Sequence, residues 1–137
     1  MQRQIVLRNS SNRTSQLPIM DQTQQLKERY KKLAIAIILM VRKLPVKQEF
    51  KILGAQLIRS ATSPGANYRA ACRAKSAKDF LNKIKIVEEE LDETLYWLEI
   101  IAELHPEAKT DLKPLWKETN ELLAIVVATL KKLRTNE

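Results

Sequence analysis

Few side chains in this sequence could act together as an acid, a base or a nucleophile. The chain has one histidine, His105, and one cysteine, Cys72. Catalysis by such groups requires a nucleophile beside a base, or two acid–base groups in contrasting surroundings. His105 directly precedes Pro106, which is typical of a loop, and Cys72 follows the apolar residue Ala71, where a free cysteine packs as a small hydrophobic side chain. We therefore expect a protein that is not an enzyme.

A run of carboxylates is the second candidate for chemistry, because clustered acidic side chains can bind metal ions. Ferritin-like helical bundles bind two metals with inward-facing carboxylates, but they also use Glu-x-x-His pairs on two helices. A chain with one histidine cannot supply two such pairs. We therefore expect no metal and no cofactor, and predict that Glu88 and Asp92 pair with Arg59 on the preceding helix. The run consists of Glu88, Glu89, Glu90, Asp92 and Glu93.

Basic residues are concentrated in the first part of the chain. The formal net charge is +8; residues 1–79 contain 16 Lys and Arg against 4 Asp and Glu, and residues 80–137 contain 8 against 12. This asymmetry indicates an anionic partner such as nucleic acid, or contacts between oppositely charged surfaces of neighbouring copies. Solvated helix faces would give the same composition, so charge alone does not choose among these.

Four apolar patterns with helical spacing predict the elements that position these charges. They run from Leu26 to Leu44, from Phe50 to Ala71, from Ala77 to Ala102 and from Leu112 to Leu133, with apolar residues three or four positions apart. Because the connections are short, consecutive helices should be neighbours. We therefore expect an all-α fold, an antiparallel up-down-up-down four-helix bundle, over residues 21–137.

The ends of the helices and of the bundle have their own signals. Asp21 or Thr23 can cap the first helix and Ser76 the third, and the fourth should begin around Thr110 or Asp111. Residues 1–20 contain no acid and no apolar period, so we expect a flexible basic arm outside the bundle. No apolar run is long enough to span a bilayer, and a lone cysteine fits a reducing compartment. The expected location is the cytoplasm.

The second helix contains a proline on its apolar side, within SATSPGANYRAACRAKS, residues 60–76. Proline inside a helix removes one backbone hydrogen bond and clashes with the carbonyl four residues earlier. We therefore predict a helix kinked near Pro64, or two helices stacked end to end. In this structural motif Gly65 would supply an unusual backbone geometry, and the Asn67 side chain would bond the backbone groups that the proline frees.

One end of such a bundle would gather basic residues from all four helices, because the start of the first, the end of the second, the start of the third and the end of the fourth meet there. We predict sequence-tolerant contacts with nucleic-acid phosphates at this end, with Arg69 and Arg73 as the most important residues. The candidate nucleic-acid-binding residues are Lys27, Arg29, Lys31, Lys32, Arg69, Arg73, Lys75, Lys78, Lys131, Lys132 and Arg134.

The third helix has more apolar surface than one core requires, which predicts self-association. The candidate interface residues are Tyr96, Trp97, Ile100 and Ile101. A protein–protein scaffold is the alternative function, since a basic surface could also meet an acidic protein.

Two motifs make the chain similar to a known family. GANYRAACRAKS, residues 65–76, and VEEELDETLYWLE, residues 87–99, resemble the bacterial four helix bundle protein family, and the coarser helix pattern extends the similarity over about residues 22–134. This family includes proteins encoded in intervening sequences of large-subunit ribosomal RNA genes, and it resembles the accessory variability determinant proteins of diversity-generating retroelements. Pro64 departs from the family pattern, in which an aliphatic residue precedes the glycine.

The resemblance implies a non-enzymatic fold that assembles as a ring-like homopentamer. The lack of a long apolar run separately predicts no membrane partner. For the retroelement relatives it implies a basic surface that binds RNA or DNA, and a reverse transcriptase partner. Other members of the family have unknown roles. The function expected from the resemblance is therefore a nucleic-acid-binding accessory protein.

Overall fold

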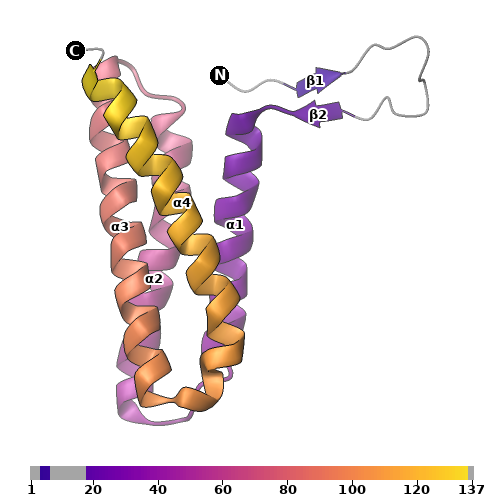
Figure 1. Cartoon of the computed structure of the whole chain (residues 1–137), viewed down its shortest axis with the longest axis vertical. Coiled ribbons are helices and arrows are strands. Elements are labelled where there is room, and N and C mark those ends of the chain that lie inside the picture. Colours follow the sequence, from indigo (N-terminus) through magenta and orange to yellow (C-terminus); the bar gives the residue numbers. More distant parts are fainter. Residues whose placement is uncertain (1–3, 7–17, 136–137) are drawn as a thin grey trace.

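Helices make up nearly all of the structure (Figure 1). The structure is a computed structural model that describes residues 4–6 and 18–135. A short 3-10 turn, Pro106–Ala108, separates the last two helices. The elements in chain order are β1 (Gln4–Val6), β2 (Pro18–Met20), α1 (Gln22–Val41), α2 (Gln48–Ala71), α3 (Ala77–Leu104) and α4 (Lys109–Thr135).

Each helix contacts the next one along the chain. α1 packs on α2, α2 on α3 and α3 on α4, and α4 also contacts α1, whereas the backbones of the two diagonal helix pairs do not approach closely within the described residues. Consecutive helices run in opposite directions, so the start of α1 and the end of α2 lie at one end of the bundle (Figure 1). α4 leans across the bundle, from the end of α1 toward the start of α3 (Figure 1). An all-helical bundle of four helices is thus confirmed.

The apolar patterns of the sequence form the core. Buried positions recur three or four residues apart on every helix, as one buried stripe per helix requires. No described helix is long and apolar enough to cross a membrane. The buried residues of α1 are Tyr30, Leu33, Ile37 and Met40; those of α3 include Ile84, Val87, Leu91 and Leu98; those of α4 include Leu112, Leu122, Val126 and Leu130.

Two helix caps lie where the sequence predicts them, and α4 begins slightly earlier than predicted. The Asp21 carboxylate accepts a hydrogen bond from the Gln24 amide at 2.8 Å, and Ser76 Oγ accepts one from the Asp79 amide at 3.0 Å. These contacts satisfy amide groups that have no partner inside the helix. α4 begins at Lys109, slightly earlier than expected, because the preceding 3-10 turn leads directly into it.

The N-terminal segment contains two short strands. β1 and β2 pair as an antiparallel two-stranded ladder in which Gln4 lies opposite Met20 and Val6 opposite Pro18. β2 leads directly into α1 (Figure 1). Residues 4–6 and 18–20 therefore have regular structure, because backbone pairing does not require the apolar period that is missing here. The flexibility of the arm stays a prediction. The remaining part of the arm, residues 1–3 and 7–17, lies outside the described residues.

α2 continues through Pro64 as a single helix, so the alternative of two stacked helices is wrong, and a bend at Pro64 stays a prediction. No described glycine has a positive φ, and Gly65 therefore does not supply an unusual backbone geometry. The Asn67 side chain donates to the Ser63 carbonyl at 3.1 Å and to Ser63 Oγ at 3.0 Å. Because Pro64 has no amide hydrogen, the Ser60 carbonyl lacks the donor that a helix would normally supply. The Asn67 side chain bonds to Ser63 and not to Ser60, so it does not satisfy the group that the proline frees.

Polar contacts join α2 to α3. Thr94 Oγ1 donates to Ser60 Oγ at 2.9 Å inside the core. Arg59 pairs with Glu90 at 3.1 Å and also with Glu93. The predicted ion pair between these helices therefore exists, but its acidic partners are Glu90 and Glu93 rather than Glu88 and Asp92, because residues on a helix that are one or two positions apart point in different directions.

Candidate nucleic-acid interface

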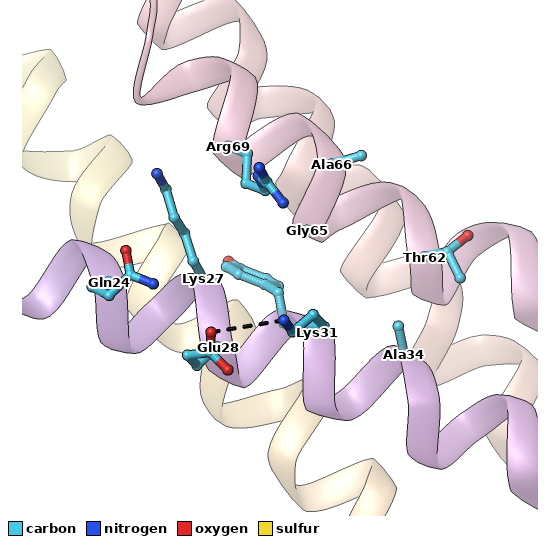
Figure 2. Close-up of a pocket in the computed structure, with 10 residues that line it drawn as sticks. Gln24, Lys27, Glu28, Lys31, Ala34, Thr62, Gly65, Ala66 and Arg69 are labelled. Carbon is cyan, nitrogen blue, oxygen red and sulfur yellow. Dashed lines mark ion pairs between the residues drawn. The ribbon is translucent and has the colours of Figure 1, made fainter. Parts of the chain in front are cut away.

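A groove lies between α1 and α2, near the start of α1 and the end of α2. Figure 2 shows the residues that line it. Its volume is about 560 Å³. Lys27, Glu28 and Lys31 of α1 lie along one wall, and Gly65 and Arg69 of α2 lie along the other. The groove therefore includes three of the predicted nucleic-acid-binding residues: Lys27, Lys31 and Arg69.

The groove exists because the two helices approach closely beneath it. A Cβ atom on Gly65 would lie 3.0 Å from the Cβ atom of Tyr30 on α1, so a larger residue would push the helices apart. Ala34 and Ala66 also line the groove, and their short side chains leave it open. Gly65 thus matters for helix packing rather than for backbone conformation.

The cations of the groove are only weakly balanced by acids. Lys27 and Arg69 form no ion pair with any described residue. Lys31 Nζ lies 3.9 Å from Glu28 Oε2, too far for a hydrogen bond. In Figure 2, Lys27 extends from α1 and Arg69 from α2 into the space between the helices. The groove thus presents three cations and one carboxylate to solvent.

Arg29 does not belong to this surface. Its Nε donates to Glu118 Oε2 at 2.9 Å, and its Nη2 donates to Glu118 Oε1 at 2.7 Å and to Glu121 Oε1 at 2.8 Å. The hydrogen bonds that Arg29 donates to Glu118 raise the pKa of Arg29 above its usual value. Arg29 therefore ties α1 to α4, and two carboxylates already balance its charge. Its role in nucleic-acid binding stays a prediction.

The other predicted basic residues are exposed and fall in different places. Lys32 lies on α1, and Arg73 in the turn after α2 rather than on the helix itself. Asp79, which follows Lys78 in the sequence, is paired with Lys83. That hydrogen bond lowers the pKa of Asp79. The end of α4 contains the last three predicted residues, Lys131, Lys132 and Arg134. This end of α4 lies away from the start of α1 (Figure 1). The end of the bundle is basic, but its cations are divided between the α1–α2 side and the α3–α4 side.

Two buried tyrosines, one from each helix, pack together beside the groove, and Tyr30 lines it. The rings of Tyr30 and Tyr68 lie 5.2 Å apart, and burial raises the pKa of both phenols. The Tyr30 hydroxyl is buried and makes no hydrogen bond to any described residue. The helical spacing of apolar residues in the sequence predicts that both tyrosines are buried. It does not predict the groove that Tyr30 lines.

Residues 22–128 match the 23S rRNA-intervening sequence protein family. The chain belongs to this family. The match includes all of α1, α2 and α3 and most of α4, and therefore both walls of the groove. Membership in the 23S rRNA-intervening sequence protein family confirms the similarity to proteins encoded in ribosomal RNA intervening sequences.

A solved structure has a similar fold. It is the crystal structure of a protein of unknown function from the S23 ribosomal protein family of Bacteroides thetaiotaomicron. It is 29% identical to this member of the 23S rRNA-intervening sequence protein family, with a TM-score of 0.71, and the alignment covers 77% of this chain and 98% of that chain. No curated protein matches the chain.

The predicted interface residues of this family member do not all reach the surface. Tyr96 is 57% exposed and Ile101 is 0% exposed, so Ile101 belongs to the core and cannot contact another subunit. Trp97 and Ile100 are half-buried, and Trp97 Nε1 donates to Glu93 Oε2 at 3.0 Å. Ile101 was misassigned because it is adjacent in sequence to Ile100, although consecutive residues on a helix point about 100° apart.

The residues first considered for catalysis lie far apart in this family member. His105 caps the end of α3, stacks edge-on against Phe50 and pairs through Nδ1 with Glu107 at 3.1 Å. Cys72 ends α2 at the opposite end of the bundle and is half-buried. Within the part of the chain that the structure describes, no three His, Cys, Asp or Glu side chains are grouped as metal ligands would be.

Proposed function

We propose that the chain is a non-enzymatic accessory protein that binds nucleic acid through the groove between α1 and α2. The observation that carries the proposal is the pair Lys27 and Arg69. These cations come from different helices, lie over one groove and have no acidic partner among the described residues. Phosphate groups suit such cations, because binding releases the counterions condensed on the nucleic acid.

The proposed contacts are with the phosphate backbone rather than with bases. Lysine and arginine contacts to phosphates position a nucleic acid without selecting its sequence. Arg73, exposed in the turn after α2, extends the positive surface beyond Arg69. Binding should therefore tolerate changes of sequence and weaken steeply with salt.

RNA is the first nucleic acid to test, because the family is described by 23S rRNA intervening sequences. A finer form of the proposal is an association with a retroelement reverse transcriptase, which the resemblance to accessory variability determinant proteins implies. Co-purification of a reverse transcriptase encoded beside this gene would support that form. The groove itself would serve either role, since both require phosphate contacts.

The experiment is fluorescence anisotropy of a labelled RNA and a labelled DNA of equal length, from about 50 to 200 mM salt. We expect the parent to bind both, with a steep loss of affinity as salt rises. The double variant Lys27→Gln/Arg69→Gln should bind more weakly at every salt concentration. In a plot of the logarithm of the binding constant against the logarithm of the salt concentration, its slope should be shallower by about 2, because two phosphate contacts are lost.

The matched control is Lys113→Gln/Lys117→Gln, which removes two exposed charges from α4. Its net charge equals that of the groove variant, so a general loss of positive charge affects both equally. We expect the control to retain most of the parent's affinity. Equal weakening of both variants, or no binding by the parent at the lowest salt, would remove the groove from the proposal.

A protein–protein scaffold is the second candidate, and exposed apolar side chains favour it. Tyr96 and Leu104 of α3 are 57% and 56% exposed, although large apolar side chains are costly to leave in water. A scaffold contact with an apolar centre would respond less to salt than phosphate binding. Binding of a protein partner that persists at high salt, without RNA or DNA binding, would favour the scaffold.

A further inference from the structure

Glu28 is the one acidic residue among the described residues that line the groove between α1 and α2. Lys27 and Lys31 lie on the same wall as Glu28, and Arg69 lies on the opposite wall (Figure 2). A carboxylate at this place repels any phosphate that the cations hold, because both groups are negatively charged. Glu28 therefore weakens the binding of a bare phosphate, and a groove for phosphates alone would bind them better without it.

Glu28 also does little to hold the bundle together. Neither of its carboxylate oxygens accepts a hydrogen bond from a described residue, and Lys31 Nζ lies 3.9 Å from its Oε2. Pairs of this spacing on one helix contribute little to stability. By contrast, the Glu118 carboxylate accepts two hydrogen bonds from Arg29 across two helices. The Glu28 side chain is 35% exposed, so its acceptor positions remain open to a molecule in the groove.

Glu28 needs a hydrogen-bond donor from such a molecule, because an ionised carboxylate can only accept. Along a DNA strand the sugar–phosphate backbone supplies none, since the oxygens of its phosphates and deoxyriboses are acceptors. RNA differs from DNA by the 2′-hydroxyl of each ribose, which is both a donor and an acceptor. In a groove that contacts the backbone, RNA can therefore satisfy Glu28, whereas DNA places phosphates near it without a donor.

The order of charges along α1 matches the order of groups along an RNA strand. Lys27 and Lys31 are one helical turn apart, about 6 Å along the axis, and Glu28 lies between them. In an RNA strand each 2′-hydroxyl lies between two consecutive phosphates. Across the groove, Gly65 and Ala66 have little or no side chain, which leaves room for a sugar. A strand that runs along α1 can thus place its phosphates at the lysines and a hydroxyl at Glu28.

We propose that Glu28 makes the groove prefer RNA to DNA, by accepting a hydrogen bond from a ribose 2′-hydroxyl of the bound strand. The inference rests on the proposed function, because the cations must hold the phosphates. Hydrogen bonds to an ionised acceptor are among the stronger ones in proteins. Lys27 and Arg69 therefore determine how tightly a strand binds, while Glu28 determines which sugar is preferred.

The test compares three labelled single strands of uridine that have the same length and differ only at the 2′ position. One contains ribose, the second deoxyribose, and the third a 2′-O-methyl group, which keeps the oxygen but removes the donor. Uracil has no amino group, so a contact between a carboxylate and a base amino group is absent from all three. By fluorescence anisotropy at low salt, the parent should bind the ribose strand about tenfold more tightly than either of the others.

The variants separate the sugar preference from the overall affinity. Glu28→Ala should bind the three strands nearly equally, and it should bind the deoxyribose strand more tightly than the parent does, because the repulsion is gone. The matched control is Glu89→Ala, which removes an exposed α3 carboxylate that pairs with no described residue. It should keep the preference of the parent. Lys27→Gln/Arg69→Gln should weaken the binding of all three strands and leave their ratio unchanged.

The results distinguish the two proposals. A parent that binds none of the strands removes the proposed function, and the role of Glu28 with it. Equal binding of all three strands keeps the groove and overturns the role of Glu28. Equal binding of the ribose and methylated strands, or a preference that persists in Glu28→Ala, also overturns it, because the hydroxyl donor or the carboxylate would not be responsible. Circular dichroism melts show that the variants are folded, as we expect because alanine favours helices.

Discussion

Gly65 of α2 lies directly against Tyr30 of α1, so closely that a Cβ atom on the glycine would lie 3.0 Å from that of the tyrosine. The same relationship recurs about three helical turns away, where a Cβ atom on Gly54 would lie 2.8 Å from Cγ1 of Val41. The chain has two glycines, and both serve the approach of α1 to α2. Gly65 lines the groove that contains Lys27 and Arg69, and Gly54 lines another groove near the connection between α1 and α2. The spacing of this helix pair therefore controls the shape of both.

Gly65→Val should destabilise the protein. The branched side chain would clash with Tyr30, and overpacking of this kind costs about 1–3 kcal/mol. The measurement is the free energy of unfolding in urea. Gly65→Ala is the matched control, because about 1 kcal/mol of added helix propensity offsets its smaller clash. Equal stability of the two variants would mean that the helices are further apart in solution.

Pro64→Ala should have little effect or should stabilise the protein. Alanine restores an amide donor for the Ser60 carbonyl inside α2, and this gain offsets the loss of packing by the buried proline ring. We expect the free energy of unfolding in urea to change by less than about 1 kcal/mol or to rise. A loss of more than about 2 kcal/mol, typical of a core cavity, would show that the packing of the ring dominates.

The fold could be predicted from the sequence because its signals are local. Ser76 and Asp21 cap helices through hydrogen bonds within one turn of chain, and the apolar spacing of each helix is set by its own geometry. The pairing of β1 with β2 could not be predicted, because their short segments have no apolar period and their contact depends on a chain reversal.

Contacts between helices were harder to predict, because a shift of one residue turns a side chain by about 100°. Arg59 was assigned to the correct helix pair and to the wrong carboxylates for this reason. Arg29 was assigned to the basic surface because its partner, Glu118, is 89 residues away in sequence. The packing of α4 against α1 brings these two residues together.

Tyr30→Phe should stabilise the protein near neutral pH. The Tyr30 hydroxyl is buried without a hydrogen-bond partner among the described residues, and such a group costs about 1–3 kcal/mol. Phenylalanine keeps the ring and its contact with Tyr68, so a higher melting temperature is the expected result. A lower melting temperature would show that the hydroxyl is hydrogen-bonded in solution.

Stability should fall in alkaline solution. Burial raises the pKa of Tyr30 and of Tyr68, whereas tyrosines in the unfolded chain ionise near pH 10. Above that pH the unfolded state has lost protons that the folded state retains, so the free energy of unfolding decreases as the pH rises. In urea titrations between about pH 9 and 11, Tyr30→Phe should show a shallower decrease than the parent. Parallel curves would mean that Tyr30 titrates normally in the fold.

The variants Arg29→Gln and Arg69→Gln each lose one positive charge, but we expect the first to lower stability and the second to lower RNA affinity. Arg29→Gln breaks the contacts with Glu118 and Glu121, and we expect a loss of about 1 kcal/mol in unfolding free energy with RNA affinity nearly unchanged. Arg69→Gln removes an exposed residue without an acidic partner, so its stability should match the parent. Its RNA affinity should fall, and its logarithmic salt dependence should be shallower by about one contact. If both variants lose affinity to the same extent, net charge rather than the α1–α2 groove determines binding.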